Sequence, residues 1–181
     1  RLWLLPLLKK YLKDIGTPLG LFRDYVMAVA LQCERASKAE NVTNAVQGVM
    51  QTRVQQMWTL FPSFASLAID THAAFRELGP MLGNALRDPR YPRLQASVCM
   101  GLTALCTEYR FGSEDQKTQA LENVLGSDKE KMKAGRQAIE RFAPNFLPIL
   151  FAGFEASNSH LFLQTIEAYI LVSPESLVET M

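Results

Sequence analysis

The side chains in this sequence that are best suited to metal binding or catalysis are two histidines and three cysteines. His72 and His160 lie far apart, and neither has a cysteine or a carboxylate at a ligand spacing on the same predicted helix face. The odd number of cysteines and the lack of a C-x-x-C pair argue against a disulfide framework and a structural zinc site. Cys99 and Cys106 share a helix face, but their neighbours are apolar, so we expect both thiols to pack in the core. The sequence predicts no metal site.

Motifs for phosphate binding and nucleophilic catalysis are absent from the sequence. It contains no G-x-G-x-x-G, no G-x-x-x-x-G-K-[ST] and no G-x-S-x-G pattern. Glu34, Glu40 and Glu155 are scattered carboxylates without a partner at catalytic spacing. We therefore expect no catalytic residues, no cofactor and no small-molecule substrate, and we predict that the protein is not an enzyme.

Two groups of basic residues are the candidates for an interaction site. One surrounds a turn between predicted helices and the other follows one helix face: Arg87, Arg90 and Arg93, and Lys129, Lys133 and Arg136. If the turns of a helical array line up along one edge, these residues form a basic stripe that contacts RNA phosphates or another partner. The alternative is an ordinary charged surface, which a soluble protein needs in any case.

The composition sets further limits on the function. The 181 residues carry nineteen Lys and Arg against eighteen Asp and Glu, so no strong net charge attracts the whole molecule to nucleic acid or to an anionic membrane. The apolar start, Leu2 to Leu8, is far shorter than the ~20 residues of a membrane-spanning helix. The sequence begins and ends within helix-like patterns, so we expect residues 1–181 to be a single helical-repeat segment of a larger protein.

The stretch Gln55–Ala65 is the predicted centre of the chain. Apolar residues recur at helical spacing up to this stretch and predict one buried face: Val42, Val46, Val49, Met50, Val54, Met57, Trp58 and Phe61. Pro62 has no amide proton for a helical hydrogen bond, so we expect the helix to end there in a buried aromatic corner. Asp70 is expected to cap the following helix by accepting its free amides.

Other helices are predicted from the same periodicity. They cover residues 4–12, 21–36, 71–86, 92–105, 142–154 and 161–172, with a weaker helix over 119–125. The polar stretch Ser37–Asn44 is either a break between two helices or part of one very long helix. Small residues around Gly101 are expected to let a neighbouring helix approach closely. No segment has the alternation of a strand, so the predicted fold class is all-α.

A proline recurs within three of these helices. The pattern apolar-x-Pro-x-apolar-x-x-x-apolar surrounds Pro6, Pro80 and Pro148 at intervals of about seventy residues, and an amphipathic helix follows each copy. Because a proline inside an isolated helix costs roughly 3 kcal/mol, its recurrence suggests a role in stacking helix pairs. The pattern predicts a HEAT-like helical-repeat solenoid, a superhelical array of stacked antiparallel helix pairs, with extra helices between the copies.

Five blocks of the sequence carry a family resemblance. They read LLPLLKKYL (4–12), QMWTLFPSF (56–64), AFRELGPMLGNAL (74–86), RFAPNFLPILF (141–151) and LQTIEAYI (163–170). In these residues, and in their order, the chain resembles the central domain of the ribosomal RNA-processing protein twelve family. The stretches 37–44 and 112–133 do not share the resemblance. It implies a large HEAT-repeat protein with no catalytic residues to carry over.

The resemblance also implies a function in ribosome assembly. Members of the family are non-enzymatic assembly and export factors for precursors of ribosomal subunits, chiefly the small subunit, in the nucleolus and nucleus. We therefore expect a scaffold or adaptor that associates with pre-ribosomal particles, other assembly factors, pre-rRNA and the Ran GTPase export machinery, and that shuttles to the cytoplasm. The alternative is a karyopherin-like nuclear transport receptor or adaptor, because those proteins are also HEAT solenoids.

Overall fold

The computed structural model of the protein describes residues 17–37, 43–66, 70–110 and 129–173. Their helices are α2 (Pro18–Ser37), α3 (Asn44–Trp58), α4 (Phe61–Ala65), α5 (Thr71–Arg87), α6 (Pro92–Arg110), α8 (Lys129–Ser157) and α9 (His160–Val172). No strand occurs within these ranges, which agrees with the predicted all-α class. The helices predicted over 4–12 and 119–125 lie outside the described residues.

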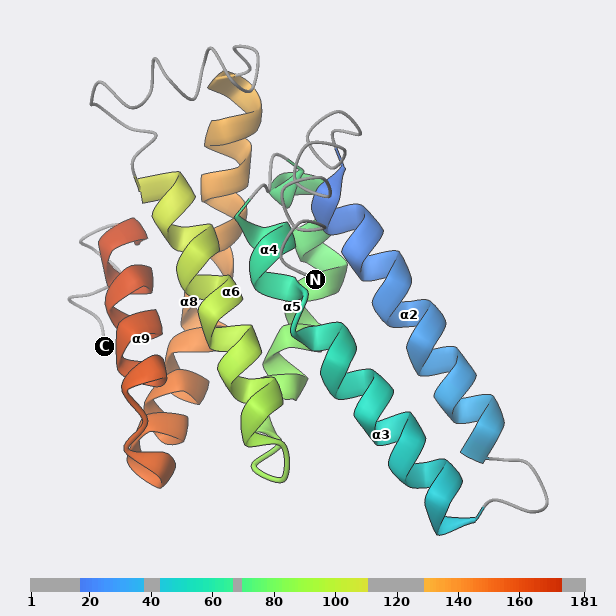
Figure 1. Ribbon diagram of the computed structural model, residues 1–181. Coiled ribbons are helices and arrows are strands. Elements are labelled where there is room, and N and C mark those ends of the chain that lie inside the picture. The colour runs from blue at the N-terminus through green and yellow to red at the C-terminus, as the bar shows by residue number, and fades with distance from the viewer. Residues whose placement is uncertain (1–16, 38–42, 67–69, 111–128, 174–181) are drawn as a thin grey trace.

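The helices are arranged in two layers (Figure 1). In one layer α2 packs against α5 and α5 against α8, while in the other α4 packs against α6 and α6 against α9. Contacts between the layers pair α2 with α3 and α4, α5 with α6, and α8 with α9. The turns from α5 to α6 and from α8 to α9 lie at the same lower edge in Figure 1. These contacts confirm the predicted HEAT-like solenoid of stacked antiparallel helix pairs.

The two helices within the described ranges that have a proline in their interior occupy equivalent places in the array. α5 carries Pro80 and α8 carries Pro148 in its interior, and the two helices lie side by side in one layer. Gly79 of α5 lies against the ring of Phe142 of α8. α2 belongs to the same layer, but its only proline, Pro18, is its first residue. The interior proline therefore marks some helices of this layer and not every unit of the array.

The corner after α3 forms an aromatic core for the first helix pair. α3 ends at Trp58 and α4 begins at Phe61, so Pro62 falls in the first turn of the new helix. The ring centroid of Phe22 from α2 lies 5.6 Å from that of Trp58 and 5.2 Å from that of Phe61. Trp58 and Phe61 are both buried, which confirms the prediction of a buried corner.

The first half of α3 differs from the prediction of one continuous buried face. Val46 is 38% exposed and Val49 is 54% exposed, whereas Met57 near the end of the helix is buried. Figure 1 shows the reason, because this half of α3 runs beside α2 alone and diverges from α6. The helix has an apolar stripe, but the array supplies neighbours for only part of it. α2 ends at Ser37, and α3 begins at Asn44 and packs back against α2, so the two are separate helices; residues 38–42 between them lie outside the described residues.

Asp70 caps a different helix from the one predicted. It directly precedes α5, but its carboxylate makes no capping hydrogen bond to the amides of α5. It instead accepts hydrogen bonds from the backbone N–H of Leu19 at 3.0 Å and of Gly20 at 2.7 Å, both in the first turn of α2. The first amides of a helix have no acceptor within the helix and attract negative charge. The buried Asp70 therefore fixes the start of α2 to the start of α5.

The helix α6 follows its prediction closely, whereas α8 is longer than predicted. Pro92 begins α6, and Leu94, Val98, Leu102 and Leu105 are all buried on one face. Gly101 contacts the ring of Phe61 so closely that a side-chain carbon there would overlap it, which confirms the close approach expected at this position. α8 begins at Lys129 instead of Phe142, because its first turns are polar and partly solvated and so lack a clear apolar period.

Candidate interaction surfaces

The first group of basic residues lies where α5 turns into α6. Arg87, Arg90 and Arg93 are all exposed. Arg90 donates through Nη2 and Nε to the Oδ2 and Oδ1 atoms of Asp88, at 2.7 and 2.9 Å, and its guanidinium lies 5.5 Å from the ring centroid of Tyr91. The hydrogen bond lowers the pKa of Asp88 and raises the pKa of Arg90, so both groups stay charged at neutral pH. Within the described residues, Arg87 and Arg93 form no ion pair and are available to a partner.

The second group lies in the first turns of α8. Lys129 is the first residue of the helix and Lys133 is exposed. Arg136 is half-buried, donating from Nε to Glu140 Oε1 at 2.9 Å and from Nη2 to the carbonyl oxygen of Val172 at 3.4 Å. Val172 ends α9, where the unpaired carbonyl groups of a helix favour a positive charge. Arg136 thus connects the start of α8 to the end of α9.

The array places these two groups at opposite edges. α5 and α8 run side by side in the same direction, with Gly79 level with Phe142. Arg87 follows Gly79 by two turns, whereas Lys133 precedes Phe142 by more than two turns. At a rise of 1.5 Å per residue, the backbones of Arg87 and Lys133 are about 25 Å apart along the helix axes. The six residues therefore do not form one continuous stripe, and each group is a separate surface.

The cysteines of α6 are part of the core, as the sequence predicts. Cys99 and Cys106 are buried. Burial raises the pKa of the Cys99 thiol to about 11 and raises the pKa of Cys106 further, so both remain protonated at neutral pH. Beside them, the hydroxyl of Thr165 donates to the carbonyl oxygen of Leu161 at 2.8 Å and lies 3.0 Å from the hydroxyl of Thr103. These polar groups join α6 to α9.

The two histidines lie apart on the surface. His72 is in the first turn of α5 and His160 begins α9, and both are exposed. Among the residues described, no three His, Cys, Asp or Glu side chains come together as a group able to hold a metal ion. In the same part of the chain, no helix has both the length and the apolar content needed to cross a membrane.

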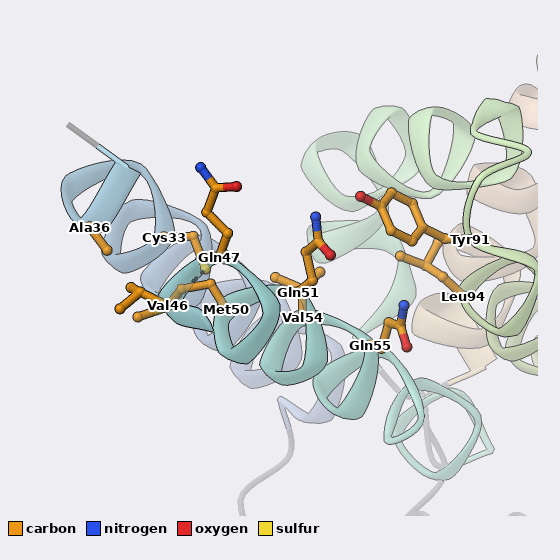
Figure 2. Close-up of a pocket in the computed structure, with 10 residues that line it drawn as sticks. All are labelled: Cys33, Ala36, Val46, Gln47, Met50, Gln51, Val54, Gln55, Tyr91 and Leu94. Carbon is orange, nitrogen blue, oxygen red and sulfur yellow. Dashed lines mark hydrogen bonds between the residues drawn. The ribbon is translucent and has the colours of Figure 1, made fainter. Parts of the chain in front are cut away.

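A groove that the sequence analysis missed lies between α3 and the start of α6 (Figure 2). Its volume is about 400 Å³, and α2, α3 and the first turn of α6 supply its walls. The side chains that line it are Cys33, Ala36, Val46, Gln47, Met50, Gln51, Val54, Gln55, Tyr91 and Leu94. The available signal in the sequence was the recurrence of glutamine at every fourth position of α3, in a helix with an apolar stripe.

Two further hollows lie along the array. One, between α2 and α3 on another side of the hairpin, has a volume of about 510 Å³ and is bordered by Tyr25, Arg53 and Leu60 among others. The other, between α6 and α9, has a volume of about 280 Å³ and is bordered by Thr107, Glu167 and Leu171 among others. Neither gathers a constellation of catalytic groups, since the charged side chain in each lies among neutral ones.

Comparison with known proteins gives a consistent result along the chain. A family model described as "Ribosomal RNA-processing protein 12, HEAT repeats" matches residues 1–157. A human protein named "RRP12-like protein" is 29% identical over all of the chain, and a chicken protein of the same name is 30% identical over 98% of it. The Saccharomyces cerevisiae protein named "Ribosomal RNA-processing protein 12" is 26% identical over 99% of the chain.

The chain covers 13% of the human and chicken relatives and 15% of the yeast relative. It thus spans about an eighth of the length of the curated relatives that it matches. No solved structure matches the chain.

Proposed function

The chain belongs to the family of ribosomal RNA-processing protein 12 HEAT repeats, and on this premise we propose that it is a non-enzymatic scaffold or adaptor in ribosome biogenesis. In this function it assists the processing of pre-rRNA and the maturation and nuclear export of ribosomal subunit precursors, chiefly of the small subunit. The observation that carries the proposal is the family match over residues 1–157, which covers most of the described two-layer array. An array of this kind presents extended surfaces to several partners at once.

The proposal includes partners and a location. The protein associates with pre-ribosomal particles and their assembly factors in the nucleolus and nucleus, contacts pre-rRNA and the Ran export machinery, and shuttles to the cytoplasm. We also propose that residues 1–181 are a single solenoid segment of a longer array. Relatives about eight times longer, which match nearly all of the chain, support this view.

Depletion of the intact protein tests the function. We expect precursors of the small-subunit rRNA to accumulate on RNA blots and the small-subunit peak in a sucrose gradient to fall, with rescue by the wild-type protein. Unchanged precursor levels, together with nucleotide-dependent binding of purified intact protein to Ran, would contradict the proposal and support a karyopherin-like transport receptor.

The basic surface at the α5–α6 turn has its own test within this proposal. Arg87→Glu combined with Arg93→Glu reverses two exposed charges that have no ion pair among the described residues. We expect it to weaken the crosslinking of the protein to pre-rRNA several-fold. Arg76→Glu combined with Arg141→Glu is the matched control, because both side chains are exposed on other turns of α5 and α8. Equal crosslinking by both double variants would exclude this surface as an RNA contact.

A further inference from the structure

The groove between α3 and α6 combines an apolar floor with a row of carboxamides. The floor is formed by half-buried or buried apolar side chains, Cys33, Met50, Val54 and Leu94. Gln47, Gln51 and Gln55 stand above it along α3, and Figure 2 shows all three directed to the same side of the helix. Within the described residues, none of these three carboxamides forms a hydrogen bond with the protein. Each can therefore offer both a donor and an acceptor to a ligand.

The spacing of the glutamines matches the backbone of an extended peptide. Residues four apart on a helix are about 6 Å apart along its axis. An extended peptide advances about 6.6 Å over two residues, and all the side chains on one of its faces recur at this interval. Three carboxamides along about 12 Å of α3 can thus pair with the N–H and C=O groups of alternate residues. The side chains on one face of such a peptide, which recur every two residues, can then lie on the apolar floor of the groove.

The charges around the groove are positive at one end. Tyr91, which lines the groove, lies under the guanidinium of Arg90 at 5.5 Å, and Arg87 and Arg93 flank the same turn. Asp88, which is paired with Arg90, is the one acidic residue between Arg87 and Arg93. α3 contains no acidic residue, and its only charged residue is Arg53. The groove therefore favours a ligand with negative charge near the start of α6 and neutral groups along α3.

We infer that this groove binds an extended segment of a partner protein that has apolar side chains at alternate positions and acidic residues at the end nearest α6. The inference rests on the proposed adaptor function and deepens it by naming the class of partner that one surface recognises. RNA fits the groove less well, because the row along α3 consists of neutral carboxamides, whereas a phosphate backbone requires positive groups.

The test is a selection of random twelve-residue peptides on the intact protein, followed by fluorescence anisotropy with a labelled peptide of the selected consensus. We expect the consensus to alternate apolar residues and to carry Asp or Glu at one end. The triple variant Gln47→Ala, Gln51→Ala and Gln55→Ala is expected to weaken binding of the labelled peptide at least tenfold. Alanine favours the helix and these side chains are not in the core, so α3 should stay folded, which circular dichroism verifies.

A matched control is the triple variant Gln56→Ala, Gln137→Ala and Gln164→Ala, which removes exposed helical glutamines from other surfaces. It is expected to bind the peptide as the wild type does. Equal losses in both variants, no loss in the groove variant, or a consensus without acidic residues would overturn the inference. The inference would also be overturned if the binding of a labelled twenty-nucleotide single-stranded RNA depended on the groove glutamines while the binding of the peptide did not. Processing of pre-rRNA after depletion is measured separately, so failure of the groove and failure of the proposed function are distinguishable.

Discussion

The contact between α5 and α8 and the outer half of α3 each contain a glycine within a helix, but the first is closely packed and the second is open. At the first, a Cβ atom on Gly79 would lie 2.6 Å from the ring of Phe142, and Phe75 packs edge-on against the same ring at 5.1 Å. At the second, apart from the chain neighbours of Gly48 and the backbone of α3 itself, no described atom lies within 4 Å of the place where a Cβ on Gly48 would be, and the adjacent Val49 is 54% exposed. The two regions differ in the number of neighbouring helices. α5 and α8 have neighbours in both layers, whereas the outer half of α3 runs beside α2 alone.

This contrast shows how one array supplies both rigidity and a binding surface. Closely packed helices have little room for change, because interiors are as dense as organic crystals. Where α3 diverges from α6, the same periodic apolar stripe lines a groove instead of a core. Where the layers of a helical array separate, an apolar helix face therefore stays open and can serve as an interaction surface.

The largest expected effect comes from truncating an aromatic residue at the closely packed contact. Phe75→Ala removes a fully buried ring that packs against Phe142 and Phe146, so we expect the free energy of unfolding to fall by about 3–5 kcal/mol. Val49→Ala on the open half of α3 is expected to change it by less than about 0.5 kcal/mol. Urea unfolding followed by circular dichroism measures both. Comparable losses would mean that the outer half of α3 is covered in solution.

The next effect concerns the carboxylate that joins α2 to α5. Asp70→Ala leaves the amides of Leu19 and Gly20 without their acceptor, so we expect a loss of about 2–3 kcal/mol in the free energy of unfolding. Asp70→Asn retains one acceptor oxygen and is expected to lose roughly half as much. Asp24→Ala is the control, because its side chain is 63% exposed on α2. If the control is as damaging as Asp70→Ala, the cap is not what holds α2.

Two glycine-to-alanine substitutions compare a closely packed position with an open one, because each adds a single methyl group. Gly101→Ala places a methyl group against the ring of Phe61, which Phe22 and Trp58 hold in place, so we expect a loss of about 1–3 kcal/mol. Gly48→Ala adds a methyl group in open space within a helix and is expected to stabilise the protein by about 0.5–1 kcal/mol. Midpoints of thermal unfolding give the signs. A gain at both positions would show that α4 can move away from α6.

The smallest perturbation is chemical labelling, which needs no substitution. At pH 8 we expect a thiol reagent to modify the half-buried Cys33 of α2 while Cys99 and Cys106 react only after unfolding. Mass spectrometry of the labelled peptides identifies the sites. Labelling of all three at similar rates would contradict the burial of α6.

The same thiols predict a pH dependence. The pKa of Cys99 rises from 9.0 to about 11 on folding, because burial disfavours the thiolate. A pKa that is raised in the folded state contributes stability below the unfolded value and loses it as the pH rises through the folded value. We therefore expect the free energy of unfolding to fall between about pH 9 and pH 11. A Cys99→Ala variant should show a shallower fall, and an unchanged slope would contradict this assignment.

The class of fold and most of the helices were predictable from the order of the residues. Apolar residues at helical spacing identified the helices within α2, α5, α6 and α9, because each needs one buried stripe. Pro62 and Pro92 fixed boundaries, since a proline cannot donate a hydrogen bond inside a helix. The resemblance of five ordered blocks supplied the family, which the comparisons confirmed. These features depend on residues that are close together in the sequence, so the sequence is sufficient to predict them.

The neighbours of each residue could be identified only after the helices were placed in three dimensions. Asp70 had the residue type and position of a cap, but only the packing of α2 on α5 brought the amides of Leu19 and Gly20 to it. The two basic groups were separated for the same reason, because the edge that a turn occupies depends on the direction of its helix. The groove beside Gln51 arose where α3 diverges from α6. Periodicity predicts that a face is apolar, whereas the path of the neighbouring helix decides whether that face becomes core or surface.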